Sequence, residues 1–425
     1  MSFAADLHLH SRYAYACSKN LSLENLSTWA KLKGLDLLAT GDFTHPLWRQ
    51  ELRQKLEMVS GGLFVFQGVR FVLGTEVSCV YSQGGRGRRV HVLLLAPDFA
   101  TVDRICLALS NGGSKLEGDG RPTLRMSARD FTAMVLEINP ECIVIPAHVW
   151  TPWYGMFGSK SGFDSLEECF LDMAPRIRAV ETGLSSDPAM NWAIPELEDR
   201  AIVSFSDAHS LPKMGREATI FEGELSYPDL AQALATNGVA YTVEFYPEEG
   251  KYHYSGHRKC GVRLSPEDSR RLGTRCPSCG RPLTLGVLHQ VREVSSAMSD
   301  TFIDDGLIDG EGFIRSVRGR PPFMRLVPLA DIIAETLGRG SASKGVQQEY
   351  LRVVRELGGE LRVLAHAGAA DLEAAAGERM AQGILKARLG DVTVEPGYDG
   401  VYGTVRVWPE TPPSSPILSV ESRPA

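Results

Sequence analysis

The chain has 425 residues, of which 43% are hydrophobic and 23% charged, and this composition excludes an intrinsically disordered protein. The length predicts two or three domains, and the lack of any run of eighteen apolar residues or of a charged leader predicts a cytoplasmic protein with no membrane contact. The formal net charge of −7 argues only weakly against a nucleic-acid partner, because an average over the chain can hide a local basic region.

From residue 1 to about residue 245, short β-branched segments alternate with longer amphipathic ones. The strand-like segments are "FAADLHLH", "LDLLATGDF", "RFVLGTEVS", "RVHVLLLAP", "CIVIPAHVW", "RAVETGL" and "AIVSFSDAH". Helical patterns lie between several of them, over 23–34, where Gly34 predicts the helix end, and over 128–140. Repeated strand-helix units predict a parallel α/β barrel or sheet.

Most of these strand-like segments carry a histidine, an aspartate or a glutamate near their C-terminal end, which is where α/β barrels carry their active sites. Imidazole and carboxylate groups are also the ligands that Zn, Mn and Fe prefer. We therefore predict a metal centre in the barrel. Its candidate ligands are His8, His10, Asp42, His45, Glu76, His91, His148, Glu181, Asp207 and His209.

Two pairs among these residues support each other. Side chains two residues apart in a strand face the same way, so His8 lies beside His10, and Asp207 beside His209. The first and last strands of a closed barrel are neighbours, which brings the two pairs together. A lone strand histidine is more often a core residue, and a lone carboxylate can cap a helix, but the joint pattern favours ligands.

A second metal site is predicted just after the barrel segment. Cys276 and Cys279 form a CxxC pair, and fifteen residues separate Cys276 from Cys260, which follows His257 at knuckle spacing. Two such pairs predict a tetrahedral structural zinc, with His253 as the alternative fourth ligand. A redox CxxC is the competing interpretation, but no βαβ pattern flanks it. The metal would supply the folding energy that so polar a segment lacks.

The same region, residues 246–290, concentrates positive charge. From Lys251 to Gln290, eight Lys and Arg residues stand against two acidic residues, a net charge of +6, so the rest of the chain carries −13. We expect this zinc-binding module to contact phosphates, with Arg258 and Lys259 as candidate residues.

Two loops at the predicted barrel mouth add candidate substrate contacts. Residues 110–126 are glycine-rich and basic, and residues 148–165 gather several aromatic side chains directly after a candidate ligand. Exposed rings beside a phosphoester site can stack on bases, whereas a buried hydrophobic lid is the competing interpretation. The candidate residues are Lys115, Arg121, Trp150, Trp153 and Tyr154.

The motifs "DLHLHS", "GDFTHP" and "SDAHS", with an isolated glutamate and two isolated histidines between them, resemble the PHP (polymerase and histidinol phosphatase) superfamily. The resemblance covers roughly residues 1–245 and implies a distorted seven-stranded α/β barrel. It also implies phosphoester hydrolysis with two or three divalent ions, Zn, Mn or Mg. Catalytic roles follow for Asp207, His8 and His10.

One stretch departs from the family pattern. Many members carry an acidic ligand shortly after the second histidine, where this chain reads "RYAYACSK". Asp42, Cys17 or a water could substitute, which leaves the number of ions at two or three. Arg12, Tyr15 and Lys19 are candidate substrate contacts in that stretch.

Further strings resemble one branch of the superfamily, the DNA repair endonucleases with a zinc-finger insert. They include "IPAHVWTPWYGMFGS", "ETGLSSDPAMNW", "CPSCGRPLTLGVLHQV" and "EPGYDGVYG". The resemblance implies hydrolysis of the phosphodiester 5′ to a deaminated base (uracil, hypoxanthine, xanthine) or an abasic site in damaged DNA, leaving a 3′-hydroxyl and a 5′-phosphate. A small-molecule phosphatase of the same superfamily is the alternative, and a non-catalytic DNA-binding adaptor is a third class.

The C-terminal region is predicted in three parts. Residues 291–319 are polar enough for a linker, residues 320–412 form a mainly helical domain with short strands, and residues 413–425 form a disordered tail rich in Pro and Ser. The string "PGYDGVYG" also resembles the tail of some bacterial repair helicases, so we expect a repair-machinery partner at this end of the chain.

Overall fold

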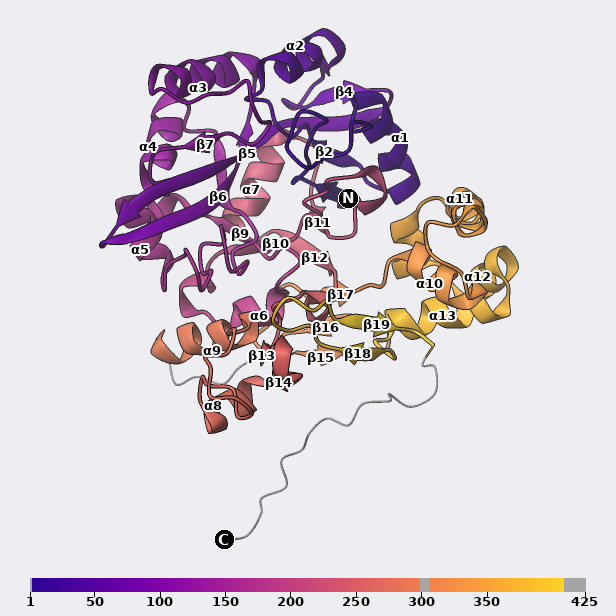
Figure 1. The fold of residues 1–425 in the computed structure, drawn as a ribbon. Coiled ribbons are helices and arrows are strands. Elements are labelled where there is room, and N and C mark those ends of the chain that lie inside the picture. The colour runs from indigo at the N-terminus through magenta and orange to yellow at the C-terminus, as the bar shows by residue number, and fades with distance from the viewer. Residues whose placement is uncertain (1, 299–305, 409–425) are drawn as a thin grey trace.

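The computed structural model describes residues 2–298 and 306–408 of the chain. Three parts are visible in Figure 1: an α/β barrel coloured from indigo to pink, a small module around β13 and α8, and a helical group in orange and yellow. Within the described ranges, no helix is both long and apolar enough to cross a membrane.

Seven strands of the described chain form the barrel. In neighbour order they are β1 (Ser2–Asp6), β2 (Leu37–Ala39), β5 (Val69–Gln83), β6 (Arg86–Ala96), β8 (Ile143–Pro146), β9 (Ala179–Glu181) and β10 (Ala201–Val203). Val149 N–H donates to Glu181 O (3.0 Å) where β8 and β9 end, and a bridge between Leu9 and Ala208 closes the ring. The α/β barrel that the sequence predicted is therefore confirmed.

One strand departs from the parallel arrangement that we predicted, because β6 runs antiparallel to both of its neighbours. The cause is the turn that joins β5 to β6. Gly84 (φ 62°) and Gly85 (φ 73°) both have positive φ, the conformation of a two-residue hairpin turn that sends the chain straight back. The hairpin places Glu76 and His91 inside long paired strands and not at strand ends.

Helices and short strands connect the barrel strands. They are α1 (Leu23–Lys33), α2 (Pro46–Lys55), α3 (Phe99–Asn111), α4 (Ala128–Ile138), α5 (Leu166–Phe170), α6 (Pro188–Trp192), α7 (Tyr227–Thr236), β3 (Glu57–Met58), β4 (Phe64–Phe66) and β7 (Thr123–Leu124). Ser22 caps α1 by accepting a hydrogen bond from Asn25 N–H, and Gly34 ends it with a φ of 79°, as the sequence predicted.

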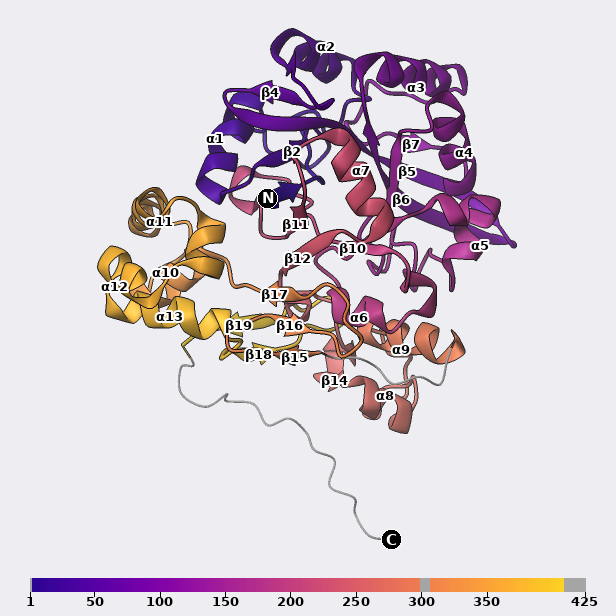
Figure 2. The same cartoon turned by 180° about the vertical axis from the view of Figure 1, so that it is seen from behind.

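Helix α7 lies across one end of the barrel (Figure 2). Tyr227 Oη donates to Glu141 O (2.8 Å), just before β8 begins, and the side chains of Leu230 and Leu234 are buried with the strand residues that fill the barrel. Because α7 covers the N-terminal end of β8, the C-terminal ends of the parallel strands open at the opposite face.

The barrel sheet continues into the C-terminal half of the chain. The added strands are β11 (Ala218–Glu222), β12 (Val239–Glu244), β17 (Phe323–Arg325), β16 (Ile314–Arg315) and β15 (Leu307–Ile308), in neighbour order from β1. The segment 291–319, which we expected to be a linker, thus holds β15, β16 and the end of α9 (Val287–Met298). Residues 299–305 of this segment lie outside the described ranges.

The predicted zinc module has a very small core. It contains the antiparallel pair β13 (Ser255–His257) and β14 (Val262–Leu264), followed by α8 (Pro266–Leu272). Its buried cluster consists of Leu264, Cys276 and Leu283. Because one of these three side chains is a cysteine of the predicted zinc site, the apolar core alone is too small to fold the module.

The C-terminal helices pack against the barrel through α1. They are α10 (Leu329–Leu337), α11 (Lys344–Leu357), α12 (Ala369–Ala376) and α13 (Glu378–Arg388), followed by the hairpin β18 (Thr393–Glu395) and β19 (Thr404–Arg406). Lys33 on α1 pairs with Glu360, and both side chains are buried. The Trp29 ring stacks on Tyr350 with centroids 6.3 Å apart. The predicted tail, 413–425, lies outside the described residues.

Candidate metal centre and zinc site

The candidate ligands gather at the open end of the barrel. His8 and His10 follow β1, Asp207 follows β10, and His148 follows β8, each just beyond the end of its strand. Glu76 reaches the same place from inside β5. Strands that lie far apart in the sequence therefore deliver their polar side chains to one point.

The first donor group consists of His8, His10, Glu76 and Asp207, whose ligand atoms all lie within 4.8 Å of one another. His10 Nε2 lies 3.1 Å from Asp207 Oδ1 and 3.4 Å from Glu76 Oε2. His8 Nε2 lies 3.5 Å from the same two carboxylate oxygens. This nitrogen is buried and makes no hydrogen bond within the described part of the chain. A buried ring nitrogen that lacks a hydrogen-bond partner and lies among carboxylates fits a ligand of a divalent cation.

The second donor group consists of Glu76, His91 and His148. Glu76 Oε1 lies 2.5 Å from His91 Nδ1 and 3.2 Å from His148 Nε2, while its other oxygen faces the first group. Glu76 is thus shared, as a carboxylate that bridges two ions would be. Among the described residues of the barrel, these are the two groups of side chains that could hold a metal ion.

The electrostatics keep both carboxylates of the first donor group, Glu76 and Asp207, ionised. Burial alone would raise the pKa of Glu76, but His91 and Arg121 hold it well below the usual range. Burial likewise opposes ionisation of Asp207, whereas His8 and His10 lower the pKa of that carboxyl strongly. Burial lowers the pKa of His91 to about 4, so this imidazole is neutral at pH 7 and free to bind a cation.

Two residues that we predicted as ligands, Asp42 and Glu181, lie behind the histidines and belong to neither donor group. Asp42 Oδ1 lies 3.0 Å from His10 Nδ1, on the side of the ring away from the donor group. Glu181 Oε1 lies 2.9 Å from His8 Nδ1, and its other oxygen accepts a hydrogen bond from His148 N–H (2.7 Å). Carboxylates in these positions fix the ring orientation and place the proton on Nδ1.

His45 and His209, also predicted as ligands, join neither group. His45 Nε2 lies 3.2 Å from Glu117 O, and its ring stacks on Tyr13 at 4.4 Å, so the imidazole is held away from the centre. His209 packs against the His10 ring at 4.8 Å, with Nδ1 2.9 Å from Asp207 O. The side chain is partly exposed at the rim.

The stretch "RYAYACSK" adds no ligand to either group. Burial raises the pKa of Cys17 to about 11, so its thiol stays protonated. Arg12 pairs with Glu51 at 2.5 Å, and Lys19 Nζ donates to Arg12 O (3.0 Å). The Tyr15 side chain, from the same stretch, is exposed.

Arg121, predicted as a DNA contact, lies on the metal centre itself. Its Nη1 is 3.0 Å from Glu76 Oε2. The loop that carries it is tightly placed, because a Cβ added at Gly120 would lie 2.5 Å from Asp42 Cγ, and Gly120 N–H donates to Tyr13 O (3.1 Å). Lys115, from the same loop, is exposed.

The aromatic loop after His148 divides into a buried and an exposed part. Trp150 is only 1% exposed, with Nε1 donating to Asn191 Oδ1 (2.9 Å), so its predicted role in base stacking is wrong and it belongs to a hydrophobic lid. Tyr154 packs on the His91 ring at 4.3 Å. Trp153, in contrast, is 45% exposed.

Thr151 also supports a candidate ligand, and nothing in the sequence predicted it. Its hydroxyl lies 2.6 Å from His148 Nδ1 and holds this ring as Asp42 holds His10. A threonine three residues after a candidate ligand is too common a pattern to reveal such a contact. For this loop, the sequence predicted only that the aromatic residues around Thr151 contact the substrate.

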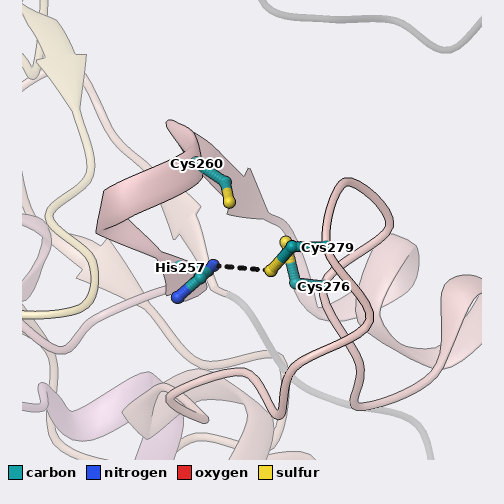
Figure 3. A group of neighbouring side chains, drawn as sticks. All are labelled: His257, Cys260, Cys276 and Cys279. Carbon is teal, nitrogen blue, oxygen red and sulfur yellow. Dashed lines mark hydrogen bonds between the residues drawn. The ribbon is translucent and has the colours of Figure 1, made fainter.

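The four predicted zinc ligands converge in the small module (Figure 3), with donor atoms within 4.8 Å of one another. Cys279 Sγ lies 3.4 Å from His257 Nδ1. His253, the alternative, is buried outside this group and stacks on Tyr254. The geometry therefore favours His257. Arg258 and Lys259 are exposed directly after it, as a phosphate contact requires.

Part of the chain matches a known protein family and a known relative. The family model of the MJ0043 C-terminal domain matches residues 328–391. The protein MJ0043 of Methanocaldococcus jannaschii is 32% identical over 269 residues, which are 61% of this chain; the chain spans about a third of that protein, 32% of its length.

Two solved structures match nearly the whole chain. The lesion-specific endonuclease PfuEndoQ of Pyrococcus furiosus is 31% identical, with a TM-score of 0.82 over 96% of this chain and 95% of that one. A structure of endonuclease Q in complex with a 27-mer duplex that holds an abasic lesion at the active site is also 31% identical. Its TM-score is 0.80 over 99% of this chain and 100% of that one.

Proposed function

Because the chain belongs to the endonuclease Q family, we propose that it is a metal-dependent DNA repair endonuclease that hydrolyses the phosphodiester on the 5′ side of a lesion. The lesions are deaminated bases (uracil, hypoxanthine, xanthine) and abasic sites, and the products are a 3′-hydroxyl and a 5′-phosphate. The observation that carries the proposal is Glu76, which joins two donor groups at the open end of a barrel beside a cationic Arg121.

The residues that would hold two divalent ions are those of the two donor groups, with Glu76 between them. Bound divalent ions supply Lewis acidity, which makes water more acidic and stabilises negative charge on a phosphoester. Zn, Mn and Mg all suit imidazole and carboxylate donors to different degrees, and we propose two ions, not three, because the described barrel donors form two groups.

The chain's own residues orient the reactants. Asp42 and Glu181 accept hydrogen bonds from Nδ1 of His10 and His8, so each Nε2 faces the centre and would give up its proton there to bind a cation. The Arg121 guanidinium binds a phosphate oxygen at the mouth. Asp207, ionised and 25% exposed, offers its carboxylate as a hydrogen-bond acceptor that orients the attacking water.

Lesion selectivity follows from the cost of removing a nucleotide from the duplex. A deaminated base pairs poorly and an abasic site has no base to unstack, so either is extruded at lower cost than a normal nucleotide. A carbonyl in place of an amino group also changes the hydrogen-bond pattern that a pocket reads. A repair-machinery partner at the segment 396–403 stays a prediction.

The experiment is a cleavage assay on a duplex with one uracil, hypoxanthine or abasic site at a known position, with Mg or Mn. We expect a single nick 5′ of the lesion, with ends that a ligase and a phosphatase identify as 3′-hydroxyl and 5′-phosphate. An undamaged duplex is the control for the DNA, and the double variant His8→Ala/Asp207→Ala is the control for the protein. Faster hydrolysis of a nucleotide or of histidinol phosphate than of any DNA would favour the small-molecule phosphatase instead.

A further inference from the structure

A row of aromatic rings and one lysine continues from the metal centre over the small module. It consists of Trp153 in the loop after His148, Lys251 and Tyr252 before β13, and Tyr402 between β18 and β19; we name these four residues the aromatic strip. The Trp153 and Tyr252 rings meet edge to face with centroids 6.3 Å apart. Lys251 Nζ lies 5.6 Å from the Tyr252 ring and 5.7 Å from the Tyr402 ring.

Backbone hydrogen bonds hold the strip in place. Gly400 N–H donates to Lys251 O (2.9 Å) and Gly403 N–H donates to Glu249 O (3.0 Å), which fixes Tyr402 beside the lysine. Val287 N–H donates to Tyr252 O (2.8 Å) and ties this residue to the start of α9. Three segments that are far apart in the sequence thus present their rings in a fixed order.

The strip is also tied to the metal centre. Trp153 lies between Thr151, whose hydroxyl contacts His148 at 2.6 Å, and Tyr154, whose carbonyl accepts a hydrogen bond from His91 N–H (2.8 Å). Thr151 and Tyr154, on either side of Trp153 in the sequence, therefore both contact histidines of the second donor group. A molecule that runs along the strip would lead directly to that centre.

The exposure of these rings needs a ligand to explain it. Trp153 is 45% and Tyr402 70% exposed, although burying aromatic surface would contribute about 25 cal/mol per Å². Single exposed tyrosines are common on protein surfaces. Rings in a fixed row with a cation between them form, in contrast, the surface that binds unpaired nucleic acid, where bases stack and the lysine meets a phosphate.

The local charge favours a polyanion over a protein partner. Residues 251–290 carry a net charge of +6. The nearby Glu248 does not offset this charge at the strip, because its carboxylate is directed to Arg325, with 3.6 Å between Oε1 and Nη1. Lys251 is exposed and has the two rings as its neighbours.

We propose that the aromatic strip binds the unpaired DNA strand next to the lesion, with bases stacked on Trp153, Tyr252 and Tyr402 and a phosphate on Lys251. This inference rests on the proposed function and deepens it, since it names single-stranded DNA as a ligand outside the metal centre. Such stacking tolerates every sequence, so the strip contributes affinity and position, while the lesion itself is read at the centre.

The test measures binding of a fluorescein-labelled strand of twelve thymidines to the full-length, zinc-loaded protein by fluorescence anisotropy. We expect Tyr402→Leu and Tyr252→Leu each to raise the Kd roughly 5- to 100-fold, because stacking contributes about 1–3 kcal/mol per base. The matched controls Tyr402→Phe and Tyr252→Phe keep the ring and stay within about twofold of the wild type. Tyr402 is mostly exposed, so its truncation leaves the fold intact.

Salt dependence separates the rings from the lysine. Lys251→Met lowers the slope of log Kd against log salt by about 0.7, the contribution of one phosphate contact on a single strand, whereas Tyr402→Leu leaves the slope unchanged. Leucine variants that bind the strand as tightly as the wild type, or phenylalanine variants as weak as leucine, overturn the proposal. The first of these results is also what a protein-docking role predicts.

Lesion cleavage, measured on the same proteins, distinguishes this proposal from the proposed function. Cleavage 5′ of a lesion together with ring-independent strand binding overturns the strip alone. Ring-dependent strand binding by a protein that cuts no lesion supports the strip and overturns the endonuclease assignment.

Discussion

The two metal sites of this protein are built in opposite ways. The ligands of the barrel centre extend from His8 to Asp207, come from several strands, and are almost all buried. The zinc ligands lie within the short stretch from His257 to Cys279, and Cys279 is exposed. The barrel fold therefore places the ligands of its metal centre, whereas the small module would depend on a bound metal ion for its own folding.

The supporting contacts differ in the same sense. In the barrel, side chains such as Asp42 and Glu181 hold the histidine rings from behind. In the module, backbone turns place the sulfurs: Cys276 N–H donates to Arg281 O (2.7 Å), and Gly280 N–H donates to Cys276 O (2.8 Å). A large apolar core keeps the barrel folded without ions, but the module has no comparable core to replace its zinc.

The largest expected effect is that of replacing Glu76, the carboxylate shared by the two donor groups, which should damage the barrel centre and spare the zinc module. Glu76→Gln removes a charge from both donor groups, so we expect lesion cleavage to fall by about 10³-fold or more, the size of several kcal/mol of lost charge stabilisation. Single-turnover cleavage and metal analysis of the purified protein measure it. The zinc of the small Cys/His module should stay bound.

The matched control is Glu217→Gln, since Glu217 is also fully buried in the barrel but belongs to neither group. Burial and the neighbouring Glu244 raise the pKa of Glu217 well above its usual range, which favours the neutral acid that an amide imitates. Equal loss of cleavage in both variants would contradict the two-group assignment.

The second prediction breaks the zinc module and spares the barrel. Cys276→Ser removes a buried ligand, so we expect the module to unfold, the zinc content to fall by one, and DNA affinity to fall roughly 100-fold as its phosphate contacts are lost. The barrel ions should remain bound. Cys142→Ser, at a buried cysteine just before β8 that lies outside both metal sites, is the control and should bind DNA normally. Loss of every ion from Cys276→Ser would show that the two sites are not independent.

The third prediction concerns the residues behind the barrel ligands. Asp42→Asn weakens the contact that orients His10, and we expect about a tenfold loss in metal affinity or cleavage, because partners of metal-bound histidines typically contribute 10–100-fold. Titration of the apo protein with Mn, followed by activity, measures the shift. Asp130→Asn, at an exposed carboxylate on α4, should behave as the wild type. A complete loss equal to that of Glu76→Gln would return Asp42 to the ligand set.

The same contrast explains what could be predicted from the sequence. The zinc ligands were identified together because their spacing is local, and only the choice between His257 and His253 needed the structure. In the barrel, the motifs indicated which residues gather at one end. They did not indicate which of these residues face the metal centre and which support a histidine ring from behind. Whether Glu181 binds an ion or holds His8 depends on a few ångströms across neighbouring strands, which no spacing encodes.

Two further features lay outside the reach of sequence reasoning for physical reasons. The direction of β6 depended on one glycine turn, although the strand pattern itself is the same for both directions. In the aromatic loop, Trp150 and Trp153 have similar neighbours in the sequence, but Trp150 is 1% exposed and Trp153 is 45% exposed. Burial of a loop residue is decided by the elements beneath it, here Asn191 near the end of α6.

The smallest expected effect tests the charge of the module apart from its fold. Lys259→Ala removes one exposed cation from a module that keeps its zinc, so binding of a lesion duplex should weaken only a few-fold, and the slope of log Kd against log salt should fall by about 0.9. The loss should be the same for damaged and undamaged duplexes, because a phosphate contact carries no sequence information. Lys115→Ala, at an exposed lysine beside the barrel mouth, provides the comparison from the other region. A loss confined to damaged DNA would place Lys259 at the lesion and not on the backbone.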